Sequence, residues 1–368
     1  MKTILHTIDS AGPGGAETVF IDLATRLPEN KYRSVVVIPD TGWVYDELCH
    51  RGVKPILLNA KGSFNLHYLR ELRKIIQSED VDLIQSHLLG ANVYCSLVGL
   101  LTGTPVIATF HGAVDISDKE RFLALKFGLI NMGASRIIAV SESLRDEMIS
   151  RTPLKKQKTA IVHNGIDTMA FLQQKSNELR HKFGWDQGDI IVGSLGNIRS
   201  AKGYDVLLRA AAKLIKGNKS FRFVIAGQGK SNGLYGELVR LREDLELQDR
   251  VEFLGFVGNQ AWFLSNLDLY LLPSITEGFS ISTIQAMAAG IPVIVTRSGG
   301  PEEIVTHKEN GWIVDKGNPA AIVDALKLLS ANPDICAALS KKAKEKVVDV
   351  FSMDAMLQKY EKIYSKLC

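Results

Sequence analysis

The residues best suited to chemistry lie between a buried apolar segment, Leu269–Leu272, and a helix of small residues, Ser280–Ala289. An acidic residue and a glycine, Glu277 and Gly278, come just before that helix. The first N–H groups of a helix have no partner within it, and the helix dipole favours negative charge there. The pattern therefore predicts a phosphate-binding site at the start of the helix.

Two polar side chains flank the predicted phosphate site. Gln285 follows Glu277 by eight residues, about two helical turns, so both side chains project from roughly the same face. One hydrogen-bonding side chain on each side of a bound phosphate suits a ligand with hydroxyl groups at both ends. We therefore expect a nucleotide-linked sugar as the ligand.

Two cations, Arg199 and Lys202, lie between the first predicted strand and the first predicted helix of the second half of the chain. A diphosphate gains negative charge as it leaves a sugar, and paired cations at a strand end would stabilise that charge. Either residue could instead be an ordinary surface charge. The pair at this location favours a role in binding the leaving group.

Other candidate residues follow predicted strands, where ligands of open α/β sheets collect. Gly14 and Gly15 would let a phosphate or sugar approach the backbone. The alternative is that they form only a tight turn between a strand and a helix. His111 could bond a substrate hydroxyl or act on a developing charge, or be structural. Gly227 and Val257 follow two later strands, as walls of a nucleotide pocket or as ordinary turns.

Strand and helix patterns alternate, which predicts an α/β protein with parallel sheets and helices on both faces. A polar, basic segment, residues 151–158, lies near the boundary between two series of strands. We therefore predict two Rossmann-like domains, residues 1–165 and 166–350, and expect residues 351–368, the end of a long helical pattern (Ile335–Leu367), to pack on the first domain. The expected strands are Thr3–Ile8, Ser34–Ile38, Pro55–Leu58, Leu83–Gln85, Val106–Thr109, Arg136–Val140, Ile190–Leu195, Phe221–Ala226, Val251–Phe253, Leu269–Leu272 and Pro292–Thr296.

Composition narrows the class of protein. The 368 residues, 46% hydrophobic and 23% charged, are enough for two domains with full cores. The net charge of +4 is spread over both halves, so nothing indicates nucleic acid as a partner. The four cysteines lack metal-ligand spacing and suit a reducing cytoplasm. The first residues lack a signal-peptide pattern, and glycines and a proline interrupt the longest apolar stretch, so we expect no membrane-spanning helix.

Two segments indicate weaker possibilities. Asp118–Ile130 is apolar on one side and carries basic residues, so it could contact anionic lipid at the inner face of the membrane. A core-facing amphipathic helix explains that pattern equally well. Asp80-Val81-Asp82 has the spelling of a metal-binding motif, but it precedes its strand, at the wrong end for a ligand site. We expect a solvated helix end there and no metal site.

Five motifs occur together in the order and spacing of the retaining family-4 glycosyltransferases of GT-B fold, and the chain resembles this family over nearly its whole length. The resemblance implies two Rossmann-like domains facing across a cleft, with a C-terminal helix crossing back to the first. The motifs are Gly14–Glu17, Phe110–Gly112, Asn164–Asp167, Lys202–Asp205 and Pro273–Phe279.

The resemblance also implies a reaction and roles for the candidate residues. A sugar would pass from a nucleotide diphosphate donor, held in the second domain, to an acceptor held mainly in the first. The anomeric configuration would be retained, and neither a metal nor another cofactor would be required. By this resemblance, the diphosphate would be bound by Arg199, Lys202, the amides of Ser280 and Ile281 and the Gly14–Gly15 loop. The donor sugar would be bound by Glu277 and, across the cleft, by His111. The ribose diol would contact Gln285, and the base would lie near Val257.

The chain departs from the family pattern at two positions. The family has a second glutamate where this chain has Gln285, and an amide forgoes a charge-assisted hydrogen bond, a loss of about 1 kcal/mol in donor binding. Many members have an arginine where this chain has Asn197. Arg199, two residues further on, would supply that cation.

The leading hypothesis is a hexosyltransferase that uses a nucleotide sugar and builds cell-envelope polysaccharide, lipopolysaccharide or glycolipid on a glycan or lipid-linked acceptor. Uridine is the expected base because it is commonest in the family, and guanosine stays open. One alternative is a nucleotide-sugar epimerase or phosphorylase of the same fold, which the contexts of Glu277 and Lys202 disfavour. The other is a non-catalytic sugar-nucleotide-binding protein, for which Gln285 is the only indication.

Overall fold

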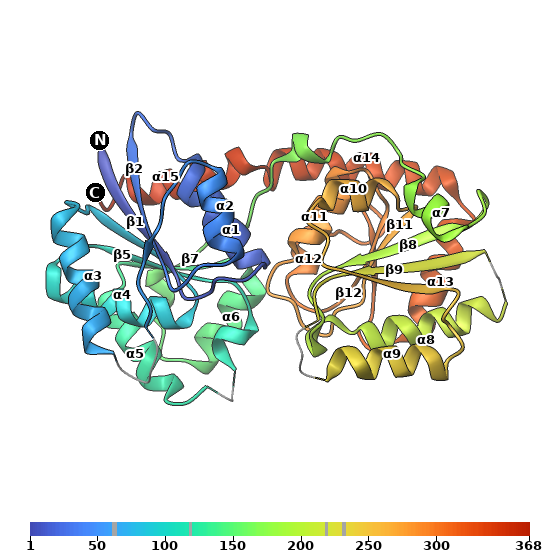
Figure 1. Ribbon diagram of the computed structural model, residues 1–368, viewed down its shortest axis with the longest axis horizontal. Helices are drawn as coiled ribbons and strands as arrows, with labels where there is room; N and C mark the ends of the chain where they lie inside the picture. The colour runs from blue at the N-terminus through green and yellow to red at the C-terminus, as the bar shows by residue number, and fades with distance from the viewer. Residues whose placement is uncertain (61–64, 118–119, 218–219, 230–232) are drawn as a thin grey trace. The chain divides into compact units, whose positions relative to one another are not determined.

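The computed structural model describes residues 1–60, 65–117, 120–217, 220–229 and 233–368. Two compact units divide the chain: Met1–Gly165 together with Asp354–Cys368, and Ile166–Met353. Each unit is built on one parallel β-sheet with helices packed against it (Figure 1). The expected α/β class with two Rossmann-like domains is confirmed.

The described strands of the first unit form one sheet of order β3-β2-β1-β4-β5-β6-β7, and every pair is parallel. The strand order reverses between β1 and β4, and loops at the carboxyl ends of such strands are the usual place for a ligand. The strands are β1 (Lys2–Ile8), β2 (Tyr32–Ile38), β3 (Ile56–Leu57), β4 (Leu83–His87), β5 (Val106–Phe110), β6 (Arg136–Ala139) and β7 (Thr159–Ile161). The helices are α1 (Gly15–Arg26), α2 (Trp43–His50), α3 (Leu66–Ser78), α4 (Leu89–Thr102), α5 (Leu123–Gly133), α6 (Glu142–Arg151) and α15 (Met353–Tyr364), with short turns η1 (Ala113–Ile116) and η2 (Lys156–Lys158).

The described strands of the second unit follow the order β10-β9-β8-β11-β12-β13, again with parallel pairs, and the order reverses between β8 and β11. The strands are β8 (Ile190–Leu195), β9 (Phe221–Ala226), β10 (Val251–Gly255), β11 (Leu269–Leu272), β12 (Val293–Thr296) and β13 (Trp312–Val314). The helices are α7 (Glu178–Phe183), α8 (Tyr204–Ile215), α9 (Leu234–Asp244), α10 (Gln260–Ser265), α11 (Ile281–Ala288), α12 (Pro301–Ile304), α13 (Pro319–Ser330) and α14 (Pro333–Val350), with turns η3 (Thr168–Phe171) and η4 (Ser200–Lys202).

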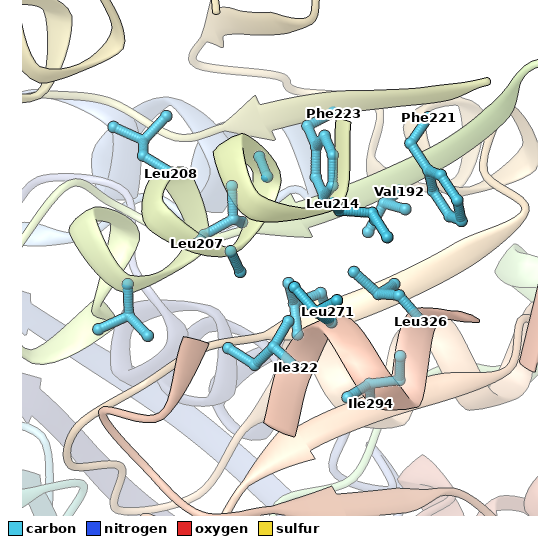
Figure 2. Packing of buried hydrophobic residues seen from close by; sticks show 14 of the residues in the cluster. Val192, Leu207, Leu208, Leu214, Phe221, Phe223, Leu271, Ile294, Ile322 and Leu326 are labelled. Carbon is cyan, nitrogen blue, oxygen red and sulfur yellow. The ribbon is translucent and has the colours of Figure 1, made fainter. Parts of the chain in front are cut away.

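Aliphatic and aromatic side chains of strands and helices form the core of the second unit. Figure 2 shows Phe223 and Leu271 from the sheet in one cluster with Leu214 of α8 and Leu326 of α13. Each of these side chains is fully buried. Burying one such side chain is worth roughly 1.5–3 kcal/mol. This packing fixes the strands whose carboxyl ends carry the candidate residues.

The C-terminal helical pattern, expected over Ile335–Leu367, is in fact two helices, α14 and α15. They are separated at Phe351 and Ser352, where the chain runs beside Ile166: the Ile166 N–H donates to the Phe351 carbonyl at 2.9 Å, and the Met353 N–H donates to the Ile166 carbonyl at 2.8 Å. These bonds replace helical ones. As expected, the final segment packs on the first unit, where Glu361 pairs with Lys31 at 2.8 Å.

Two short strands, β7 and β13, were not expected from the sequence. Each has three residues, too few for a recognisable alternation of apolar and polar side chains. The basic segment before β7 is the end of α6 followed by the turn η2, rather than one surface turn. β3 is also shorter than the expected Pro55–Leu58.

The segment that could contact lipid corresponds mostly to α5. Its Phe127 and Ile130 are fully buried, while Leu125 and Met132 are 63% and 60% exposed. The core-facing alternative therefore explains part of its apolar pattern; residues 118 and 119 lie outside the described part of the chain. Among the described helices, none combines the length and the apolar character that crossing a bilayer requires.

The acidic motif at residues 80–82 lies at the amino end of the first sheet. Asp82 accepts a hydrogen bond from the Thr3 N–H at 2.8 Å and pairs with Lys2 at 2.9 Å. This carboxylate therefore ties β1 to the start of β4, at the end of the sheet opposite the expected ligand loops.

Helix α5 approaches α4 closely at Gly133, where an added Cβ would lie 2.1 Å from the Ser96 carbonyl oxygen. Gly128, on the same helix, has open space around it. We expect Gly133→Ala to lower the free energy of unfolding by about 1–3 kcal/mol, because the helices must separate. Gly128→Ala should raise it by about 0.4–1 kcal/mol. Urea unfolding of both variants checks this, and equal effects would contradict the close contact.

Candidate functional site

The strongest candidate in the second unit is an ion pair between two loops that the sequence separates widely. Lys202 Nζ lies 2.8 Å from Glu277 Oε2, with the side chains 18% and 14% exposed. The Ser274 hydroxyl donates to the same carboxylate oxygen at 2.9 Å. The structure thus brings together two residues that the sequence predicted as diphosphate and sugar ligands.

Backbone contacts fix the two loops that carry this pair. The Ile275 N–H donates to the Ala201 carbonyl at 2.8 Å, and the Glu277 N–H donates to the Ser298 carbonyl at 2.9 Å. Gly203 has φ +63°, and an added Cβ would lie 2.3 Å from the Pro273 carbonyl oxygen. Glycine is therefore required after Lys202 both for its backbone conformation and for the close approach of the loops.

Helix α11 begins at Ile281, four residues after Glu277, and has a conventional cap. The buried Ser280 hydroxyl accepts the Thr283 N–H at 3.3 Å. Such a cap satisfies one donor of the first turn, and the N–H of Ile281 belongs to the donors that the helix itself does not use. The strand, the loop and the helix start that the sequence predicted are therefore all present at these residues.

Gln285 lies on α11, as predicted, but its side chain contacts α10. Its Nε2 donates to Gln260 Oε1 at 2.7 Å, and the residue is 6% exposed. No sequence pattern indicated Gln260 as its partner. The structure joins Gln285 to this amide and joins Glu277 to Lys202, so the two side chains have different partners.

The remaining candidates of the second unit lie on loops at the carboxyl ends of β8, β9 and β10. The Gly227 N–H donates to the Gly255 carbonyl at 2.8 Å, and an added Cβ on Gly227 would lie 1.9 Å from the Gly196 carbonyl oxygen. Val257 is half-buried two residues after Gly255, and Arg199 is exposed at the start of η4. These loops pack backbone against backbone, which explains the glycines without a ligand.

In the first unit, His111 follows β5 and contacts the last residue of β4. His111 Nε2 lies 2.8 Å from His87 Nδ1, and the two rings are stacked with centroids 5.1 Å apart. No pattern in the sequence linked His87 to His111. Burial lowers the pKa of His111 to about 3 and that of His87 well below its usual value, so both rings are neutral near pH 7.

Two carboxyl groups that the sequence did not single out lie on loops of this unit, and one of them, the buried Asp115, contacts His111. Asp115 accepts the N–H groups of His111 at 3.1 Å and Leu89 at 3.2 Å, and Asp9 accepts that of Ala91 at 3.2 Å. Burial raises the pKa of Asp115 to about 7 and that of Asp9 to about 6. Asp9 directly follows β1, and Asp115 lies five residues after the end of β5. An acidic residue shortly after a strand of a parallel sheet is the signal that could have identified both.

Gly14 and Gly15 begin α1, as predicted. The Glu17 carboxylate folds back over Gly14, where an added Cβ would lie 2.2 Å from Glu17 Oε2. A carboxylate at a helix start is favourable. This acidic group therefore lies at the helix end where the sequence predicted a phosphate or sugar.

Metal-binding geometry is not found in the described part of the chain, where no three His, Cys, Asp or Glu side chains are grouped to hold an ion. The positive charge at the candidate site comes from Lys202 and the start of α11.

Two family models match the chain, one in each unit. Residues 13–169 match the model described as Glycosyltransferase Family 4, and residues 175–346 match the model described as Glycosyl transferases group 1. Together they include all five motifs and all of the candidate residues.

Similar proteins with known names include two bacterial enzymes. The chain is 27% identical over 309 residues to the N-acetyl-alpha-D-glucosaminyl L-malate synthase of Bacillus anthracis, covering 82% of this chain and 79% of that one. It is 23% identical over 364 residues to the Escherichia coli UDP-Gal:alpha-D-GlcNAc-diphosphoundecaprenol alpha-1,3-galactosyltransferase, covering 95% and 93%.

Among solved structures, HepE of Anabaena in complex with UDP and glucose is similar over the full length of both chains, with a TM-score of 0.90 and 22% identity. At that identity the likeness shows the fold alone, and the fold is GT-B.

His6, on β1, allows a test of how burial of a histidine changes the stability of the first unit with pH. Its ring is fully buried, neither ring nitrogen has a partner in the described structure, and burial lowers its pKa to about 3. Between about pH 3 and the ordinary value near 6.5 the unfolded chain therefore binds a proton that the folded chain does not, so folding weakens as pH falls.

We expect His6→Leu to remove this dependence. The stability of the variant relative to the unchanged protein should rise by about 1.4 kcal/mol for each pH unit below 6.5. At pH 7.5 it should already be more stable by about 1 kcal/mol, because an unpaired polar group is gone. Urea unfolding from pH 7.5 to 5 measures both effects, and parallel curves would show that His6 is not buried as a neutral ring.

Proposed function

This chain belongs to the glycosyltransferases that the family 4 and group 1 models describe, and we propose that it transfers a sugar, with retention, from a uridine diphosphate sugar to a hydroxyl of a glycan or lipid-linked acceptor. The observation that carries the proposal is the Lys202–Glu277 ion pair beside the start of α11. Lysine, a helix start and a fixed carboxylate together suit a diphosphate joined to a sugar.

The charge at this site supports stabilisation of a leaving group. As the bond between the anomeric carbon and the phosphate oxygen breaks, negative charge grows on the diphosphate. Lys202 would exchange part of its contact with Glu277 for a phosphate oxygen, while the amides of Ser280 and Ile281 bind another. Arg199, exposed on the neighbouring turn, would add a second cation. These groups supply the charge that a metal ion would otherwise provide.

Retention follows in this proposal from attack on the face that the diphosphate leaves. The acceptor oxygen forms a bond to the anomeric carbon while the bond from that carbon to the phosphate oxygen breaks. The acceptor proton passes to the departing phosphate oxygen, so no protein base is required. Glu277, held by Ser274 and Lys202, would bond the donor sugar, and His111 would bond a hydroxyl of the sugar.

The names of similar proteins support the choice of uridine. The Escherichia coli relative uses UDP-Gal by its name, and HepE was solved with UDP. We place the base at the loop of Val257, with Gly227 forming part of the pocket wall and the ribose near Gln285.

The names of relatives also suggest the acceptor, and here they point to two different compounds. The Escherichia coli relative acts on a diphosphoundecaprenol-linked sugar, which suits a role in cell-envelope glycan or lipopolysaccharide synthesis on the cytoplasmic side of the membrane. Contact of the enzyme with anionic lipid would be peripheral. The Bacillus anthracis relative is named for a glucosaminyl malate, so L-malate is the competing acceptor to be tested.

A screen of nucleotide sugars by thermal shift, followed by transfer assays, tests the function. A ligand that binds the folded chain raises its melting temperature. We expect the largest shift with a UDP-sugar, and sugar transfer to an undecaprenol-linked acceptor with the same anomeric configuration. Binding without hydrolysis or transfer would favour a sensor, and conversion of the free sugar nucleotide would favour an epimerase.

Removal of the lysine tests the proposed leaving-group role. We expect Lys202→Ala to lower turnover by about 10²–10³-fold, the usual loss for one stabilising group at a developing charge. The melting temperature should change little, because Ser274 still holds Glu277. Lys213→Ala, an exposed lysine on α8, is the matched control. Turnover in the Lys202 variant equal to that of the control would refute the assignment.

The family glutamate can be restored at position 285. We expect Gln285→Glu to bind UDP about fivefold more tightly, because a carboxylate forms a charge-assisted bond with the ribose hydroxyls worth about 1 kcal/mol. The Gln260 amide can rotate and donate to the new carboxylate. Isothermal titration with UDP measures the change. Unaltered or weaker affinity would place Gln285 away from the ribose.

A further inference from the structure

A chain of buried polar side chains extends from His111 to the C-terminal helix. His111 Nε2 lies 2.8 Å from His87 Nδ1, and His87 Nε2 lies 3.2 Å from Gln85 Nε2. Gln85 continues to two hydroxyl groups, with its Nε2 2.8 Å from Thr109 Oγ1 and its Oε1 3.1 Å from the Tyr364 hydroxyl. Gln85, His87 and Tyr364 are fully buried, so water does not compete for these bonds.

The orientation of the Gln85 amide determines where the protons of this chain lie. With Nε2 toward His87, its two hydrogens go to His87 Nε2 and Thr109 Oγ1, and Oε1 accepts the Tyr364 hydroxyl hydrogen. Every donor of Gln85 and Tyr364 is then satisfied. This orientation meets the requirement that buried polar groups be hydrogen-bonded.

The opposite amide orientation leaves buried donors unpaired. Oε1 would accept from Thr109 and His87, and Nε2 would donate one hydrogen to the Tyr364 oxygen. The second amide hydrogen and the Tyr364 hydroxyl hydrogen would then have no acceptor among the contacts of this chain. Each unpaired buried donor costs about 1–3 kcal/mol, so the first orientation is favoured.

The favoured orientation fixes the tautomers of both histidines. Because His87 Nε2 accepts from Gln85, a neutral His87 carries its hydrogen on Nδ1 and donates it to His111 Nε2. A neutral His111 then carries its hydrogen on Nδ1. His111 Nδ1 is buried and has no hydrogen-bond partner in the described structure.

Packing also holds the two rings in place. The edge of Phe20 meets the His87 ring with centroids 5.5 Å apart, and Asp115 accepts the backbone N–H of His111 at 3.1 Å. His111 therefore has little freedom to rotate and find another partner. An unpaired donor on a fixed, neutral ring is suited to a ligand oxygen.

We propose that Gln85 and His87 are positioning residues that hold His111 as its Nδ1–H tautomer, so that one N–H is reserved for a ligand oxygen. That this oxygen is a sugar hydroxyl rests on the proposed function. The Tyr364 hydroxyl completes the chain by binding the Gln85 carbonyl, so the last helix contributes to the state of a histidine that follows β5.

Nitrogen-15 NMR of the full-length protein labelled at histidine tests the tautomer without a substrate. In neutral imidazole the protonated and unprotonated nitrogens have well-separated chemical shifts, and the His111 signals are assigned by their loss in His111→Gln. We expect His111 and His87 each to show a protonated Nδ1 and an unprotonated Nε2 throughout pH 6–8. A His111 with its hydrogen on Nε2, or one that becomes doubly protonated in this range, would overturn the proposal.

The variant Gln85→Met tests the role of the amide. Methionine has a similar size but donates nothing to His87, so both tautomeric arrangements of the histidine pair then leave the same number of unpaired groups. We expect the His111 shifts to move toward the midpoint between the two forms. Retention of the unchanged His111 shifts in this variant would show that Gln85 does not set the tautomer.

Tyr94→Phe is the matched control, because Tyr94 is buried in the same unit and its hydroxyl accepts the Asn65 N–H at 2.9 Å, away from Gln85 and the histidines. It should leave the His111 shifts unchanged, and an equal movement there would indicate a general packing effect. These shifts need no substrate. The tautomer result is therefore valid even if no sugar transfer is found. If the protein transfers sugar while His111 carries its hydrogen on Nε2, only this inference is refuted and the proposed function is not.

Discussion

The burial of both faces of two parallel sheets is the constraint on which the rest of this structure depends. Strands such as β1 and β11 have apolar side chains on both sides, so the charged candidate residues lie on loops at strand ends. The carboxyl ends of neighbouring strands meet at one edge of each sheet. Lys202 and Glu277 are brought together for this reason, although 75 residues separate them.

The charge of the side chains on these loops differs between the two units. In the second unit, a lysine and a carboxylate neutralise each other in a partly exposed position, where a stronger anion can compete for the lysine. In the first unit, burial keeps histidines uncharged and raises the pKa of two carboxyl groups. The second unit is therefore suited to a charged group and the first to neutral hydroxyl groups.

The sequence predicted the class of fold because long apolar strands and their flanking glycines are local signals. It also predicted the loop around Glu277, since a strand, a glycine and a helix start occur within a dozen residues. It could not predict the partners of Gln285 or His111. Those depend on the packing of α10 and on the register of β4 beside β5, neither of which has a local signal. β7 and β13 were missed because three residues carry too little pattern.

The assignment of α15 to the first unit affects how the chain folds during synthesis. The ribosome completes residues 1–165 long before it makes Tyr364, whose hydroxyl binds Gln85 at the centre of that sheet. Until then the surface that α15 covers, including β4 and the ring of Tyr32, lacks its natural cover. A nascent first unit therefore exposes apolar surface for most of translation, which is the condition under which chaperones bind.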